Sequence, residues 1–306
     1  MIPTELFGKW RSFAFRRKMF HVLMIAPAAL VVCAVIVYPL LVGFRISFYK
    51  LRIFTGMDAL KNLDPSLANY TRMFQSAQFW NAVQTTITYV LVSTVVCALI
   101  GLGTALLINQ SIRGRGLARA LIISPWPIPG VIAASIFSWM FDANFGVVNY
   151  LLRSAGLISK NIAWTASSTT AMVAVIAATA WKGYPFFTVS LLAGLQSILT
   201  ELYEAAKIDG ANAFREFRYI TLPALRPVLG ICMIINSLWS FRQFEIIYNL
   251  TKGGPARSTE TLAIQVYQEA FKFFEMGYGA AIGIFTVALS VITTLFFSRV
   301  IASRFY

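Results

Sequence analysis

Four side chains that could bind a polar solute lie between positions 236 and 243 of one apolar run. They are Asn236, Trp239, Arg242 and Gln243, in the sequence NSLWSFRQFE. On a helix, Trp239 would share a face with Arg242, three residues on, and with Gln243, four residues on. Hydrogen-bonding groups beside an aromatic ring can bind a polyhydroxylated solute, so we predict a polar lining here.

A second polar group lies in the apolar run AWKGYPFF, which contains Trp181, Lys182 and Tyr184. With Trp126, these residues are candidates for the same lining. A charged side chain inside a membrane span is costly and usually functional. A structural alternative stays open for Lys182, whose amino group could instead extend to a membrane interface.

Arg242 also has two possible roles. Glu245 lies three residues after it, so the two side chains could form an ion pair on one helical face. Alternatively, Arg242 and Lys182 together could favour an anionic solute.

Residues for covalent chemistry are scarce. His21 is the single histidine, and the apolar runs contain no paired carboxylates and no metal-ligand spacing. Cys33, Cys97 and Cys232 lie singly in apolar runs, which predicts reduced, buried core residues. The sequence GxxxxGK[ST], which would bind ATP phosphates, is absent. We therefore expect a protein that is not an enzyme, with no catalytic residue, metal or cofactor in this chain.

The composition indicates which elements must position these side chains. The chain of 306 residues is 58% hydrophobic and 12% charged, whereas soluble proteins are about 25% charged. Six apolar runs approach the roughly 20 residues that a bilayer requires. We place them at 21–44, 83–108, 118–141, 169–192, 225–248 and 277–298. The sequence thus predicts an all-α membrane protein with a six-span domain over 21–298 and tails at 1–20 and 299–306.

Two features argue against a cleaved signal peptide and against a nucleic-acid-binding protein. The first apolar run is longer than the roughly 7–15 residues of a signal-peptide core, so we read an uncleaved helix. The net charge of +14 comes from Lys and Arg residues that lie mostly between apolar runs, not in one patch with interleaved aromatic residues. We therefore expect a lipid bilayer, and no nucleic acid, as a partner.

Basic residues also predict the orientation. The N-terminal tail, the loop NQSIRGRGLAR and the C-terminal tail are rich in Lys and Arg, and six spans would put them on one side. Such segments face the cytoplasm, so both termini are expected there. The long segment 45–82, on the opposite side, is also basic, with five basic and two acidic residues.

Prolines are expected to distort two spans. Pro125, Pro127 and Pro129 occupy alternate positions in LIISPWPIPG, and Pro185 follows Lys182 in the fourth run. Each removes a backbone donor, so carbonyl groups freed inside a membrane need another partner. The first group is either an entry turn at the interface or a kink beside a polar pathway. We expect a similar break in the fourth span.

The polar segment at about 197–224, between spans four and five, is predicted to fold. Thr200 could cap a helix, and Glu201 suits its first turn. Gly210 supplies the left-handed residue that ends helices, and Pro223 would stop a second short helix. A simple connection needs only a few residues, so a folded segment of this length indicates a docking element.

This segment resembles the EAA motif of permease subunits of bacterial ABC importers. In EAAKIDGANAFREFRYITLP the motif positions, with their spacing kept, are Glu204, Ala205, Ala206, Asp209, Gly210, Ile220, Leu222 and Pro223. The stretches WKGYPFFTVSLLAGLQSI and FEIIYNLTKGGPARSTETLAIQVYQEAF resemble carbohydrate-importer permeases of the maltose type. The resemblance therefore extends over nearly the whole chain.

The resemblance implies an inner-membrane permease for a sugar or sugar-like solute, working by alternating access. It implies three kinds of partner: a second permease subunit, usually in a heterodimer, two ATPase subunits that hold ATP and Mg, and an extracytoplasmic solute-binding protein. The EAA segment would couple the ATPases to the spans. The alternative is a stand-alone secondary transporter or channel. It would more often contain inverted repeats and acidic residues within spans, where Glu245 is the single candidate.

Overall fold

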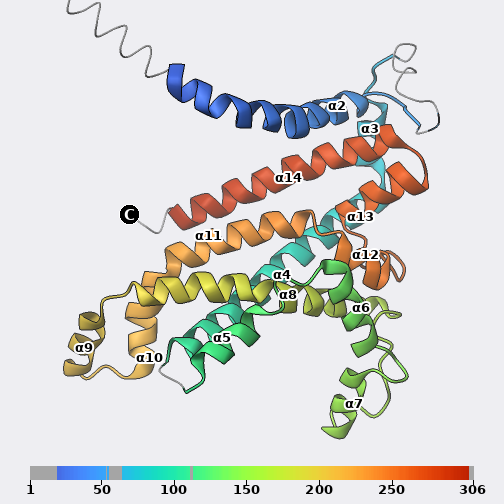
Figure 1. Cartoon of the computed structure of the whole chain (residues 1–306). Helices are drawn as coiled ribbons and strands as arrows, with labels where there is room; N and C mark the ends of the chain where they lie inside the picture. The colour runs from blue at the N-terminus through green and yellow to red at the C-terminus, as the bar shows by residue number, and fades with distance from the viewer. Residues whose placement is uncertain (1–18, 53, 55–63, 111–112, 303–306) are drawn as a thin grey trace, which may run out of the picture.

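The protein is an assembly of helices (Figure 1). The structure is a computed structural model that describes residues 19–52, 54, 64–110 and 113–302. Within these ranges every regular element is helical, which agrees with the predicted all-α class. Most of the predicted tail at 1–20, and residues 303–306 of the second predicted tail, lie outside the described residues.

Five helices in the described part of the chain are long and apolar enough to cross a membrane. Three are α4 (Ala77–Asn109), α8 (Ser168–Gln196) and α14 (Met276–Ala302). The helix Met19–Ile46 ends with η1 (Cys33–Val37) and α2 (Tyr38–Ile46), and Ala213–Phe241 comprises α10 (Ala213–Glu216), η4 (Phe217–Thr221) and α11 (Leu222–Phe241). All five overlap predicted spans, because an apolar run of this length is itself the membrane signal.

The predicted third span at 118–141 is not one helix. α5 (Arg115–Ile123) ends before a series of turns, and α6 (Gly130–Met140) begins after them. Pro125, Pro127 and Pro129 lie in this interval. Three alternate residues without an amide N–H cannot continue the hydrogen bonding of a helix. The distortion that we expected at these prolines is confirmed, and it divides the predicted span into two helices.

The fourth predicted span shows the opposite result. α8 continues through Pro185, so the break that we expected there is absent. A single proline removes only one intrahelical hydrogen bond. Close packing against α4 accompanies this continuity: a Cβ atom at Gly101 of α4 would overlap Phe187 of α8. Small residues at such contacts allow membrane helices to approach closely.

The predicted fifth span ends seven residues early. α11 stops at Phe241, and the short helix α12 (Glu245–Thr251) follows after a turn. In this turn the main-chain N–H of Gln243 donates to the Ser240 carbonyl at 3.1 Å. At the other end, α10, η4 and α11 form one continuous helix that contains Pro223. The predicted stop at Pro223 is therefore wrong. A π-helical turn directly precedes α11, and Pro223 lies in the first turn of α11, where a missing amide donor is tolerated.

The core lies where α4, α8 and α11 meet, and polar bonds join these helices. Asn236 of α11 donates to Thr94 of α4 at 2.9 Å, and the hydroxyl groups of Tyr89 and Thr179 are 3.0 Å apart. Cys97 and Cys232 are buried in the same region, as predicted. Interhelical hydrogen bonds of this kind hold membrane helices together.

The first helix, Met19–Ile46, stands apart from this core (Figure 1). None of the residues in its most apolar 18-residue window is buried, and only its end packs on α14. Cys33 is consequently exposed within this chain, so the prediction that all three cysteines are core residues is wrong for Cys33.

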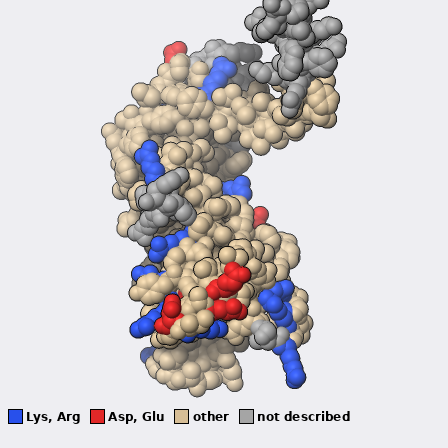
Figure 2. Space-filling view, turned by 90° about the vertical axis from the view of Figure 1, so that its left-hand side faces the viewer, with Lys and Arg blue, Asp and Glu red and all other residues tan. Residues whose placement is uncertain are grey.

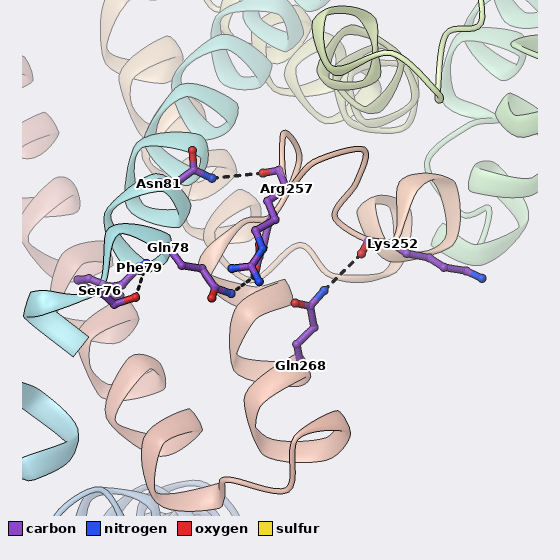
Figure 3. A network of polar contacts seen from close by, with 8 residues as sticks. Ser76, Gln78, Phe79, Asn81, Lys252, Arg257 and Gln268 are labelled. Carbon is purple, nitrogen blue, oxygen red and sulfur yellow. Dashed lines mark hydrogen bonds and ion pairs between the residues drawn. The ribbon is translucent and has the colours of Figure 1, made fainter. Parts of the chain in front are cut away.

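The remaining helices lie at the ends of the long ones. α9 (Thr200–Ile208) and α10 lie at one end, and α3 (Ala68–Gln75), α7 (Val147–Ser154), α12, α13 (Leu262–Tyr267) and η5 (Gln268–Lys272) lie toward the other (Figure 1). A polar network binds the second end together (Figure 3). The buried Glu260 accepts from Gln78 Nε2 at 2.9 Å, and its carboxylate is 3.6 Å from Arg257 Nε. Asn81 donates to the Arg257 carbonyl at 3.3 Å, which ties α4 to the α12–α13 connection.

Candidate functional site

The first candidate site is the segment 199–223, here called the α9–α10 hairpin. α9 ends at Ile208, and Gly210 has a φ angle of +75°, the left-handed conformation expected for it. The Ala211 amide then donates to the Ala206 carbonyl at 2.8 Å. Asn212 caps α10 by accepting from the Arg215 amide at 2.9 Å. The hairpin therefore has a defined turn.

Thr200 does not cap α9, contrary to the prediction. The N-cap position is Leu199, and Thr200 is the first helical residue. The two arms are instead held by Tyr203 of α9 and Thr221 of η4, whose hydroxyl oxygens are 2.9 Å apart. This bond fixes α9 against the base of the helix that leads into the core.

Much of the hairpin surface is exposed and apolar. Ile208, Phe214 and Tyr219 are 87%, 72% and 73% exposed. Figure 2 views the end of the molecule that carries the hairpin and shows acidic side chains gathered between basic ones. Glu201, Glu204, Asp209 and Glu216 are the acidic residues of this segment, and Glu204 and Asp209 are exposed. Exposed apolar side chains among charged ones are typical of a protein interaction site.

The predicted motif residues occupy two positions relative to this surface. Glu204, Ala205, Asp209 and Gly210 are exposed near the turn, and Ala206 is half-buried beneath it. The last three, Ile220, Leu222 and Pro223, are half-buried in the helix that continues to the core. The pattern thus spans the exposed turn and the start of a long helix.

The second candidate site is a cavity of about 660 Å³ between α4, α8, α11 and the turns before α6. Six of the predicted lining residues surround it, together with Glu245. The six are Trp126, Lys182, Asn236, Trp239, Arg242 and Gln243. The volume lies within the range of small-molecule sites, about 300–1,000 Å³.

Trp181 and Tyr184 do not line this cavity. Trp181 packs against the hydrophobic core, with its ring centroid 5.5 Å from that of Phe137. Tyr184 lies half-buried on α8. Because Lys182 faces the cavity, its neighbours at positions 181 and 184 are turned to other faces of the helix.

Lys182 connects the cavity to the proline turns. Its Nζ donates to the Trp126 carbonyl at 3.0 Å, and Trp126 also lines the cavity. A carbonyl group at the interrupted helix thus has a charged donor as its partner. The contact joins Lys182 of α8 to the proline turns at the edge of the cavity.

The predicted pair of Arg242 and Glu245 does not form. Because α11 ends at Phe241, the two residues are not on one helix, and no ion pair between them occurs among the described residues. Glu245 instead interacts electrostatically with Lys182 and lies against the start of α6, where a Cβ at Gly130 would overlap its carboxylate.

Several cavity residues were missed by the sequence argument. Tyr89 and Thr179 line the cavity from the middle of α4 and α8, and Ser240 lines it from α11. Single hydroxyl-bearing residues occur throughout these apolar runs, so the sequence offered no signal for these three. These three residues line the cavity because of the way the helices pack, which the sequence alone does not reveal.

Comparison with known proteins identifies the family. Residues 97–305 match the family described as "Binding-protein-dependent transport system inner membrane component". The chain belongs to this family. It is therefore a membrane-embedded permease component of a transport system that works with a binding protein. The α9–α10 hairpin and all the cavity-lining residues except Tyr89 lie within the matched region.

Two relatives extend the likeness beyond the matched region. The permease is 35% identical over 287 residues to the sulfoquinovosyl glycerol transport system permease protein SmoG of Agrobacterium fabrum, covering 94% of this chain and 92% of that protein. It is also 35% identical over 286 residues to the trehalose/maltose transport system permease protein MalF of Thermococcus litoralis, covering 94% and 95%.

A solved structure shares the fold. A chain from the crystal structure of a bacterial ABC transporter involved in the import of the acidic polysaccharide alginate has a TM-score of 0.79 to this permease. The match covers 97% of this chain and 99% of that chain, with 22% sequence identity. The likeness therefore shows a shared fold over nearly the whole of both chains.

Proposed function

We propose that this chain is the transmembrane subunit of an ATP-driven ABC importer and forms half of the path for a sugar or sugar-like solute. The observation that carries the proposal is the exposed α9–α10 hairpin with the EAA spacing, at the base of a helix that reaches a polar cavity. The two relatives named above support a sugar-like solute, because both are permeases of sugar transport systems.

The chain crosses the membrane six times in this proposal. Five crossings are the long apolar helices, and α5 and α6 together make the third. Both termini and the hairpin face the cytoplasm. The helix beginning at Met19, the hairpin and the end of α14 lie toward the same side in Figure 1, which supports this orientation. The permease domain is 21–298, with the coupling loop at about 197–224.

The hairpin docks on a separate ATPase subunit, which binds ATP and Mg. Ile208, Phe214 and Tyr219 supply apolar contact area that is open to solvent in this chain. Glu204 and Asp209 form the charged border. The Tyr203–Thr221 bond would transmit a displacement of α9 into the continuous helix Ala213–Phe241 and so to the cavity. Closure of two ATPases would then drive alternating access.

The cavity is the part of the path that contacts the solute. Trp239 and Trp126 provide aromatic faces, and Asn236 and Gln243 provide amide groups, all on the cavity lining. Amides and aromatic rings together suit the hydroxyl groups and apolar faces of a sugar. A second permease, usually a different chain, would complete the path, and an extracytoplasmic binding protein would deliver the solute.

Purification tests this proposal. The tagged chain is extracted in mild detergent from its own membranes, and the co-purifying proteins are identified by mass spectrometry. We expect a second permease and an ATPase, and ATP hydrolysis by the assembly that a sugar-loaded binding protein stimulates. A chain that purifies alone and moves solute into vesicles without ATP would instead support a stand-alone transporter.

A further inference from the structure

The charges around the cavity are unbalanced. Its lining contains two basic side chains, Lys182 and Arg242, and one acidic side chain, Glu245. Arg242 and Glu245 are exposed in this chain and Lys182 is half-buried, so the excess positive charge is open to a bound group of opposite charge. The distribution of partners among these three residues therefore indicates what the cavity is built to hold.

The charge of Glu245 is already compensated. Its carboxylate lies against Gly130 at the beginning of α6, where the first amide groups of a helix lack intrahelical acceptors and carry partial positive charge. Lys182 interacts electrostatically with the same carboxylate. Lys182 in turn has a fixed position, because its Nζ donates to the Trp126 carbonyl at 3.0 Å.

Arg242 is the charged residue of the cavity that has no partner among the described residues. It follows the last residue of α11, and no hydrogen bond or ion pair joins its guanidinium to another residue in the described parts of the chain. Trp239 and Gln243 lie beside it on the same cavity. A guanidinium presents paired N–H donors that match both oxygens of a carboxylate or sulfonate, which a neutral sugar hydroxyl cannot offer.

Resting on the function proposed above, we infer that this importer carries an anionic sugar and that Arg242 anchors its carboxylate or sulfonate group. The sugar ring would then lie against Trp239, with Gln243 bonding its hydroxyl groups. The relatives do not decide the solute's charge, because permeases named for a sulfonated and for a neutral solute are equally similar to this chain. The lining of the cavity carries the inference.

The test begins with the solute. The purified binding protein of the complex is incubated with an equimolar mixture of six saccharides. They form three pairs, each of an acidic and a neutral member: sulfoquinovosyl glycerol with glucosyl glycerol, digalacturonate with galactobiose, and glucuronate with glucose. Mass spectrometry identifies what it retains. The full complex is then reconstituted in liposomes with internal ATP, and uptake of the retained saccharide is measured. We expect the acidic member of a pair to be retained and transported.

Variants of Arg242 locate the anchor. Arg242→Gln should lower uptake of the acidic saccharide by about tenfold or more, the effect of losing a charge-assisted bidentate contact. Arg242→Lys should retain an intermediate rate. Lys160→Gln, which removes a positive charge from an exposed loop, is the control and should transport normally. Equal recovery of the partner subunits with each variant checks folding.

The possible failures are distinguishable. Retention and transport of a neutral saccharide would overturn the inference and leave the sugar importer standing. Uptake of an acidic saccharide that Arg242→Gln does not reduce would remove Arg242 as the anchor. If none of the six saccharides is retained and none stimulates ATP hydrolysis, the proposed sugar-import function itself fails.

Discussion

Lys182 Nζ lies 3.0 Å from the main-chain oxygen of Trp126 and donates a hydrogen bond to it. The two residues belong to different helical segments, α8 and the proline turns between α5 and α6. The contact joins an interrupted segment to an uninterrupted one at the edge of the cavity. It satisfies a carbonyl group in a region where three prolines leave few local donors.

The first prediction concerns this contact. Lys182→Met should loosen the turns before α6, because the Trp126 carbonyl loses its donor at a cost of about 1–3 kcal/mol. We expect a lower melting temperature of the detergent-solubilised complex and faster hydrogen exchange at Trp126, Ile128 and Gly130. Lys182→Arg keeps a cationic donor, so its melting temperature and exchange rates should be closer to those of the parent protein. Unchanged exchange in Lys182→Met would refute the structural role of this bond.

The prolines show which features of the fold could be predicted from the sequence and which could not. The apolar runs predicted α4, α8 and α14 because length and hydrophobicity directly report burial in a bilayer. Whether a proline breaks a helix depends on the neighbouring residues and on packing. Pro185 lies within a helix that packs closely on α4, whereas Pro125 is followed by two further prolines at alternate positions.

The sequence predicted which residues line the cavity better than it predicted how these residues are arranged. Asn236, Trp239 and Arg242 were found because polar residues are rare in apolar runs. Their geometry differs from the expected helical face, because α11 ends at Phe241 and Gln243 lies in the following turn. The Lys182–Trp126 bond joins positions 56 residues apart, so no local pattern contains it.

The second prediction tests the turn of the α9–α10 hairpin. Gly210→Val places a β-branched side chain at a φ angle of +75°, which costs about 1–2 kcal/mol and favours another turn conformation. Nothing lies within 4 Å of the added Cβ, so the fold of the spans should persist. We expect loss of the ATPase from the purified complex, measured by the ratio of subunits.

Gly156→Val is the matched control for that experiment. Gly156 has a φ angle of +71° and equally open surroundings, but it follows α7 at the other end of the molecule. The two substitutions therefore impose similar backbone strain at distant places. If both variants lose the ATPase to the same extent, general destabilisation and not the hairpin would explain the effect.

The third prediction separates transport from assembly. Trp239→Ala and Gln243→Ala remove an aromatic face and an amide from the cavity, and each should reduce solute uptake by about tenfold, while the subunits still co-purify. Trp181→Ala should behave differently, because Trp181 packs on Phe137 in the core and its loss should cost about 3–5 kcal/mol. Normal uptake in both cavity variants would exclude this cavity from the solute path.

The fourth prediction uses the buried carboxyl group of Glu269, which lies in η5 outside the long apolar helices. The residue is 5% exposed, and no hydrogen bond to its carboxylate occurs in the described residues. Burial raises the pKa of Glu269 above its usual value of 4.5. Arg72 and Arg257 oppose this shift of the pKa, whereas Glu275 and Glu260 reinforce it.

A raised pKa means that the folded protein binds this proton more tightly than the unfolded chain does. Ionised Glu269 therefore weakens the fold at neutral pH, and the weakening fades as pH falls through the raised pKa. Glu269→Gln should raise the melting temperature of the complex at pH 7, and this gain should shrink steadily toward pH 4.5. Asp64→Asn, at an exposed position, should show no such trend. A gain that grows on acidification would mean that the ionised carboxylate stabilises the fold, with Arg72 outweighing burial.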